Sequence, residues 1–117
     1  MTSQGDEGMW LFSNPPKQLL KDKYQIDLTD DWLQHLQLSS VRLNNGGSGS
    51  FVSPKGLLLT NHHVGSDALQ KLSPANKDYY LDGFTAKTAA EELKCPDLEV
   101  NVLQEIIDVT KQVNDAV

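Results

Sequence analysis

The sequence contains a single cysteine, Cys95, so no disulfide can form within the chain. No apolar run approaches the roughly eighteen residues that a membrane-spanning helix needs. The first residues, MTSQGDE, have neither the positively charged head nor the apolar stretch of a secretory signal, and by themselves they are typical of a cytosolic protein. Lys and Arg number 10 against 16 Asp and Glu, and the resulting net charge of -6 argues against a nucleic-acid-binding surface.

The length of 117 residues sets an upper limit of one domain. A chain of this size can bury roughly two-thirds of the surface that it exposes when unfolded. The sequence has no internal repeat, and the only compositionally biased stretch is a short glycine- and serine-rich run at residues 46–50.

Two short helices are predicted near the start of the chain. Asn14 is a typical helix cap, and it precedes a helix expected over residues 17–24. Thr29 is expected to cap a second helix. Trp10 and Trp32 are interpreted as core residues rather than as platforms for a ligand.

A β-hairpin that leads into two histidines is predicted from the string SGSFVSPKGLLLTNHHV, residues 48–64. A turn at 53–56 separates two short strands. The second strand, 57–60, contains three consecutive leucines, which indicates burial on both faces. This strand is expected to end on His62 and His63, at the rim of a packed core.

The remaining elements are expected from local signals. They are a first strand at 41–43, a helix over 64–72, a loop-like stretch at 73–87, a helical turn at 89–93, a strand over 98–109 and a helix that begins at 110.

A histidine held rigidly at the rim of a core is suited to act as a general base. On a strand, alternation would place His62 and His63 on opposite faces, so only one of them could face a nucleophile. His62 is assigned to packing or to a supporting hydrogen bond. A metal site that uses both histidines and Asp67 is not expected, because adjacent histidines on a strand diverge and the i, i+4 histidine pair of helical zinc sites is missing.

The glycine- and serine-rich run at 46–50 contains a serine flanked by glycines, as a nucleophile elbow does. An elbow needs a strand before the serine and a helix after it, whereas here a strand follows. Ser48 is therefore not expected to be a nucleophile, and the glycines are expected to serve the backbone.

Thr60-Asn61-His62-His63 resembles the segment that carries the general base in trypsin-like serine peptidases, with His63 in the catalytic place. Other segments, in the same order, resemble the N-terminal part of the bacterial dipeptidyl-peptidase family of serine exopeptidases. These segments are DEGMW at 6–10, SVRLNNGGSGS at 40–50, DGF at 82–84 and AEELKCP at 90–96.

The resemblance implies a mostly β fold with short helices, which would form the first, partial β-barrel of a chymotrypsin-like double-barrel peptidase. Residues 1–38 would be a helical lead-in, and residues 39–117 would belong to the barrel. Val64 stands where a cysteine often follows the base in this fold, so the disulfide found there in other members would be missing.

The resemblance also implies an enzyme that releases dipeptides from the free N-termini of oligopeptides, with His63 as its general base. The family's Gly-Asp-Phe-Ser-like and Gly-Asn-Ser-Gly-like segments, which hold the catalytic aspartate and serine, are absent. The nearby acids stand in other contexts; they are Asp67, Asp78, Asp82, Asp97 and Asp108. The chain is therefore expected to be an N-terminal piece that is not active alone.

No cofactor is implied, and the expected partners are oligopeptide substrates, with no nucleic acid and no membrane span. The resemblance implies a periplasmic or secreted protein whose leader has been lost, and it is compatible with a homodimeric full-length enzyme. The alternative is a non-catalytic trypsin-like half-barrel that binds or regulates, or a nonproductive gene fragment.

Overall fold

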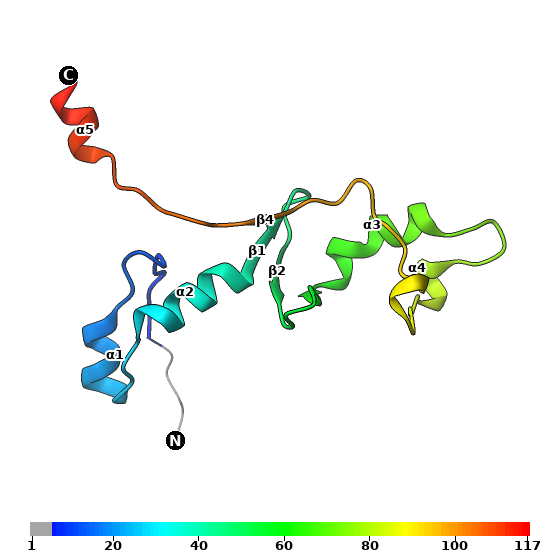
Figure 1. The fold of residues 1–117 in the computed structure, drawn as a ribbon, viewed down its shortest axis with the longest axis horizontal. Coiled ribbons are helices and arrows are strands. Elements are labelled where there is room, and N and C mark those ends of the chain that lie inside the picture. Colours follow the sequence, from blue (N-terminus) through cyan, green and yellow to red (C-terminus); the bar gives the residue numbers. More distant parts are fainter. Residues whose placement is uncertain (1–5) are drawn as a thin grey trace. The chain divides into compact units, whose positions relative to one another are not determined.

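The structure is a computed structural model that describes residues 6–117 (Figure 1). The chain divides into two compact units. One consists of Met1–Leu38 together with Leu103–Val117, and the other of Ser39–Val102. Residues 1–5 of the expected lead-in lie outside the described residues, and the division into 1–38 and 39–117 stays a prediction.

The helices and strands are short throughout the described residues. They are α1 (Lys17–Tyr24), α2 (Asp30–Ser39), β1 (Ser40–Leu43), β2 (Ser48–Phe51), β3 (Leu58–Thr60), α3 (His62–Leu72), α4 (Tyr79–Asp82), a 3₁₀ turn (Ala89–Glu91), β4 (Val100–Val102) and α5 (Thr110–Asp115). More of the described residues lie in helices than in strands, so the expectation of a mostly β chain is too strong.

The strands of the second unit form one antiparallel sheet in the order β3-β2-β1-β4. Figure 1 shows β4, from much later in the chain, beside β1, where Arg42 lies opposite Asn101. The sheet is open, with β3 and β4 at its edges. The prediction of β structure is thus confirmed as a four-stranded antiparallel sheet with short helices, and the sheet is not a closed barrel.

The core of this unit is small and joins the sheet to α3. Val41 and Leu43 of β1 are buried together with Val64 of α3, and partly buried apolar residues surround them. Leu58 of β3 packs against this core, whereas Leu59 of the same strand and Leu57 just before it are 59% and 60% exposed. Burial of residues 57–60 on both faces is therefore wrong, because the side chains alternate and only one face meets the core.

In the first unit both predicted helices form, but one predicted cap is wrong. Pro16 precedes α1, and Asn14 instead ends a tight turn in which its backbone N–H donates to Leu11 O at 3.0 Å. Thr29 caps α2 as predicted, because its Oγ1 accepts a hydrogen bond from Trp32 N at 3.2 Å. Trp10 and Trp32 are 54% and 52% exposed, so their interpretation as core residues is wrong.

The later elements are shorter than the sequence predicts. The expected strand over 98–109 pairs only at Val100–Val102, and the loop-like stretch 73–87 contains the short helix α4. The helical turn near residue 89 and the helix that begins at 110 are confirmed. No helix within residues 6–117 is both long enough and apolar enough to span a membrane.

Candidate active site

The two histidines lie in the first turn of α3 and not on a strand. β3 ends at Thr60, Asn61 is extended with φ -83° and ψ 150°, and the helix begins at His62. The prediction that strand alternation separates His62 from His63 is therefore wrong. Within α3, Val64, Ala68 and Leu72 are spaced four residues apart and so lie on one side of the helix.

The His63 side chain is exposed to solvent. Among residues 6–117, no hydrogen bond, ion pair or ring contact to its imidazole is found. Its backbone carbonyl accepts a hydrogen bond from Ser66 Oγ at 3.0 Å, within the first turns of α3. The ring is therefore accessible to a reacting group while its backbone is held in the helix.

His62 has a different environment from that of its neighbour. Its ring lies 5.5 Å from the ring of Tyr80 in α4, with the two planes tilted by 49°. This distance is within the range of favourable aromatic pairs. His62 thus contacts α4, which agrees with its predicted packing role.

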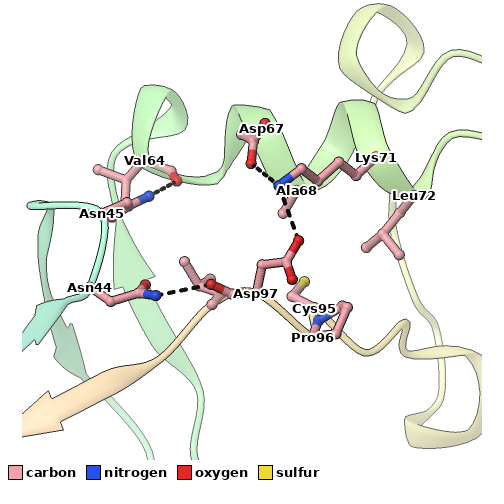
Figure 2. A pocket seen from close by; sticks show the side chains of 11 residues that line it. Asn44, Asn45, Val64, Asp67, Ala68, Lys71, Leu72, Cys95, Pro96 and Asp97 are labelled. Atoms are coloured by element: carbon pink, nitrogen blue, oxygen red, sulfur yellow. Dashed lines mark hydrogen bonds and ion pairs between the residues drawn. The ribbon is translucent and has the colours of Figure 1, made fainter.

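The residues on either side of the histidines are hydrogen-bonded to the β1–β2 hairpin. Before them, Thr60 Oγ1 donates a hydrogen bond to Ser48 O at 2.7 Å. After them, the Val64 side chain is buried, and Asn45 Nδ2 donates to Val64 O at 2.8 Å (Figure 2). The backbone that carries His63 is therefore held on both sides.

The glycines of the run 46–50 have a backbone role, as the sequence predicts: they allow an unusual backbone angle and close contacts with neighbouring segments. Gly46 has a positive φ of 92°, which favours glycine in the turn. A Cβ at Gly47 would lie 2.5 Å from Cγ1 of Val64, and a Cβ at Gly49 would lie 2.7 Å from Leu59 O. Ser48 opens strand β2 and is not followed by a helix, so the structure around it is not a nucleophile elbow.

Two of the nearby carboxylates share one lysine. Lys71 Nζ lies 2.8 Å from Asp67 Oδ2 and 3.0 Å from Asp97 Oδ2, and Figure 2 shows the lysine between them. Hydrogen bonds from the Lys71 ammonium, first to Asp67 and then to Asp97, raise the pKa of this lysine. Although Asp67 follows His63 by one helical turn, its carboxylate is thus engaged by Lys71.

Two other carboxylates accept hydrogen bonds from backbone N–H groups close to them in the sequence. Asp78 caps α4, because its Oδ1 accepts hydrogen bonds from Tyr80 N at 2.9 Å and from Leu81 N at 3.1 Å. Asp108 accepts a hydrogen bond from Thr110 N at 2.9 Å, and bonds from Thr110 lower the pKa of this carboxyl. Among the described residues, no carboxylate forms an ion pair or hydrogen bond with His63.

A cavity of about 250 Å³ lies between α3, the β1–β2 turn and the segment before β4 (Figure 2). Asn44 holds that segment, since its Nδ2 donates to Asp97 O at 3.0 Å and its Oδ1 accepts from Glu99 N at 3.1 Å. Asn44 and Asn45 therefore fasten the turn to two different parts of the unit. Sequence reasoning missed both roles, although consecutive asparagines before two glycines are typical of a turn whose side chains form local hydrogen bonds.

The sequence pattern of the family described as Peptidase S46 matches residues 5–117 of the chain. The chain therefore belongs to the peptidase S46 family, and the family resemblance predicted from the motifs is confirmed. No solved structure matches the chain significantly.

Several curated bacterial peptidases are similar to the chain over most of its length. It is 39% identical to dipeptidyl-peptidase 7 of Phocaeicola vulgatus over 100% of the chain and 17% of the relative. It is 40% identical to the Asp/Glu-specific dipeptidyl-peptidase of Porphyromonas endodontalis over 92% of the chain and 16% of the relative. It is 35% identical to dipeptidyl-peptidase 7 of Porphyromonas gingivalis over 95% of the chain and 17% of the relative. The chain thus spans about a sixth of the length of these relatives.

Proposed function

We propose that the chain is the N-terminal part of a serine dipeptidyl-peptidase and supplies the general base, His63. The observation that carries this proposal is the exposed imidazole at the start of α3, where Asn45 of the β1–β2 turn donates a hydrogen bond to Val64 O and the Thr60 hydroxyl donates one to Ser48 O of β2. A general base has to be accessible and well positioned, and this arrangement meets both needs.

In the proposed reaction, His63 takes the proton from a serine hydroxyl as that oxygen attacks the peptide carbonyl, and then gives the proton to the leaving amine. The serine and the aspartate that orients the imidazole would come from another part of the whole protein. The engagement of Asp67 and Asp97 by Lys71, and of Asp78 as a helix cap, supports this division of roles.

Dipeptide release is proposed from the names of the relatives, which are dipeptidyl-peptidases. Relatives that are named Asp/Glu-specific and relatives that are not match this chain about equally, at 40% and 39% identity. This similarity supports the idea that residues 1–117 carry chemistry common to both groups rather than the determinants of substrate preference. The substrates of the whole protein would be oligopeptides with a free N-terminus.

The wider setting is proposed from the family resemblance. Residues 39–117 would complete their open sheet as the first barrel of a chymotrypsin-like double barrel, with 1–38 as a helical lead-in. The whole protein would act in the periplasm or outside the cell, and it could be a homodimer.

The test is made in the whole protein that contains these residues, with His63→Ala and His62→Ala as matched variants. His63→Ala should lower the turnover of a peptide with a free N-terminus by about 10⁴-fold or more, as expected for a triad member, without loss of folded protein. His62→Ala removes the contact with Tyr80 and should lower stability more than turnover. Equal losses of turnover, or the larger loss at His62, would show that His63 is not the base. A peptide with a blocked N-terminus serves as the control for dipeptide release.

A further inference from the structure

We propose that Asn45 is a positioning residue for His63, an inference that rests on the proposed function. Asn45 belongs to the turn between β1 and β2, far from α3 in the sequence. Its side-chain amide nevertheless donates a hydrogen bond to the carbonyl of Val64, the residue that follows His63. The bond joins the turn to the peptide unit next to the candidate base.

The amide of Asn45 uses both of its polar atoms. Nδ2 donates to Val64 O at 2.8 Å, while Oδ1 accepts from Gly47 N at 3.3 Å and so shapes the turn. Gly47 in turn lies directly against the Val64 side chain, where no Cβ would fit. Asn45 therefore contributes a directional bond at a place where packing already brings the turn and α3 together.

Packing and hydrogen bonding restrict different motions of this segment. The buried Val64 side chain resists movement of α3 away from the sheet, but apolar contacts have little directional preference. A hydrogen bond weakens steeply as it departs from linearity, so the bond to Val64 O opposes rotation of the first turn. Rotation of that turn would re-aim the imidazole of His63, which is one residue away.

Asn44 provides a matched comparison, since it is adjacent to Asn45 and its side-chain amide also forms two hydrogen bonds with backbone groups. Its Nδ2 donates to Asp97 O at 3.0 Å and its Oδ1 accepts from Glu99 N at 3.1 Å, so it holds the segment before β4 and not α3. Asn45→Asp and Asn44→Asp each keep the size of the side chain and one acceptor oxygen, remove the donor, and add the same charge beside the same cavity.

The experiment compares these two variants in the whole protein, after the activity of the wild type and its loss in His63→Ala have been established. Asn45→Asp should lower kcat by about 10- to 100-fold, the scale of a small misplacement of a catalytic group, and leave KM nearly unchanged. Asn44→Asp should leave kcat nearly unchanged. If wild type lacks activity, or His63→Ala keeps it, the proposed function itself fails.

Amide hydrogen exchange in the whole protein gives a readout that does not depend on activity. Asn45→Asp should speed exchange in the first turns of α3, and Asn44→Asp should speed it around residues 97–99. The Asn45 proposal is overturned if the two variants lower kcat equally, if the loss in Asn45→Asp is in KM alone, or if Asn45→Asp leaves exchange in α3 unchanged.

Discussion

Val64 and Gly47 illustrate how single residues set the position of the candidate base. Val64 is 5% exposed and packs with Val41 and Leu43, so it fixes the start of α3 against the sheet. This contact is possible because Gly47 has no side chain, and the β1–β2 turn can approach the Val64 methyl groups closely. His63 is joined directly to Val64 and therefore takes its place from a packing contact between residues far apart in sequence.

The first prediction at this scale concerns Gly47→Ala. The new Cβ would lie 2.5 Å from Cγ1 of Val64, well inside van der Waals contact, and the buried valine cannot yield without disturbing the core. We expect the free energy of unfolding to fall by about 1–3 kcal/mol, as for other overpacked sites. The shift in the urea concentration at which half of the whole protein is unfolded measures this loss.

Gly65→Ala is the matched control, because it makes the same change in the adjacent helix α3. A Cβ at Gly65 has no neighbour within 4 Å, and alanine forms helix better than glycine. This variant should be neutral or more stable by up to about 1 kcal/mol. A Gly47→Ala protein as stable as Gly65→Ala would show that the close approach at Gly47 does not hold α3.

At the scale of the elements, local signals predict the helices better than the ends of the strands. Residues 17–24 and the cap at Thr29 are found as predicted, because caps and helix formers act within a few residues. The strand over 98–109 is overpredicted, since its apolar alternation continues but its partner β1 has only four residues to pair with. Strand length here depends on a distant segment.

In the candidate site too, local sequence predicts some features, and others depend on contacts between distant segments. The Thr-x-x-His pattern after a hairpin makes His63 the candidate base, which stays a prediction, whereas the predicted backbone role of the glycines is found in the structure. The sequence does not place the histidines on a helix, because the string LLLTNHHV is compatible with a longer strand. Burial of Val64 against β1 and the bond from Asn45 favour the helix, and neither is visible in local sequence.

A second prediction contrasts a cap that the structure contains with one that it does not. Thr29→Ala removes the hydrogen bond from Trp32 N to Oγ1 and should lower the free energy of unfolding by about 1 kcal/mol. Asn14→Ala should have little effect, because Asn14 is exposed and is not the residue before α1. Urea unfolding followed by circular dichroism measures both, and a larger loss in Asn14→Ala would contradict the assignment of the caps.

At the scale of the whole molecule, the described residues bury little apolar surface. Val41, Leu43 and Val64 are the buried apolar residues among positions 6–117. Many large apolar side chains are exposed, among them Leu59 of the edge strand β3 and Leu57 just before it. An uncovered apolar face next to an unpaired strand edge favours association with other chains.

The third prediction is therefore that the isolated 117-residue chain self-associates or is poorly soluble. Sedimentation velocity over a range of concentrations should show oligomers, and exposed apolar surface should bind a hydrophobic dye. The opposite result would be a monomer at all concentrations with one sharp, two-state unfolding transition. That result would favour a self-contained binding or regulatory module over part of a larger enzyme.

Labelling with a fluorophosphonate probe distinguishes a chain that supplies a general base from one that also contains an activated nucleophile. Such a probe bonds to a serine oxygen only where a base activates the hydroxyl and donors stabilise the developing negative charge. We predict that the 117-residue chain is not labelled. The whole protein should be labelled at a serine outside these residues, and His63→Ala, but not His62→Ala, should abolish that labelling. Labelling of Ser48 or Ser50 in the short chain, or undiminished labelling of the whole protein with His63→Ala, would contradict the account.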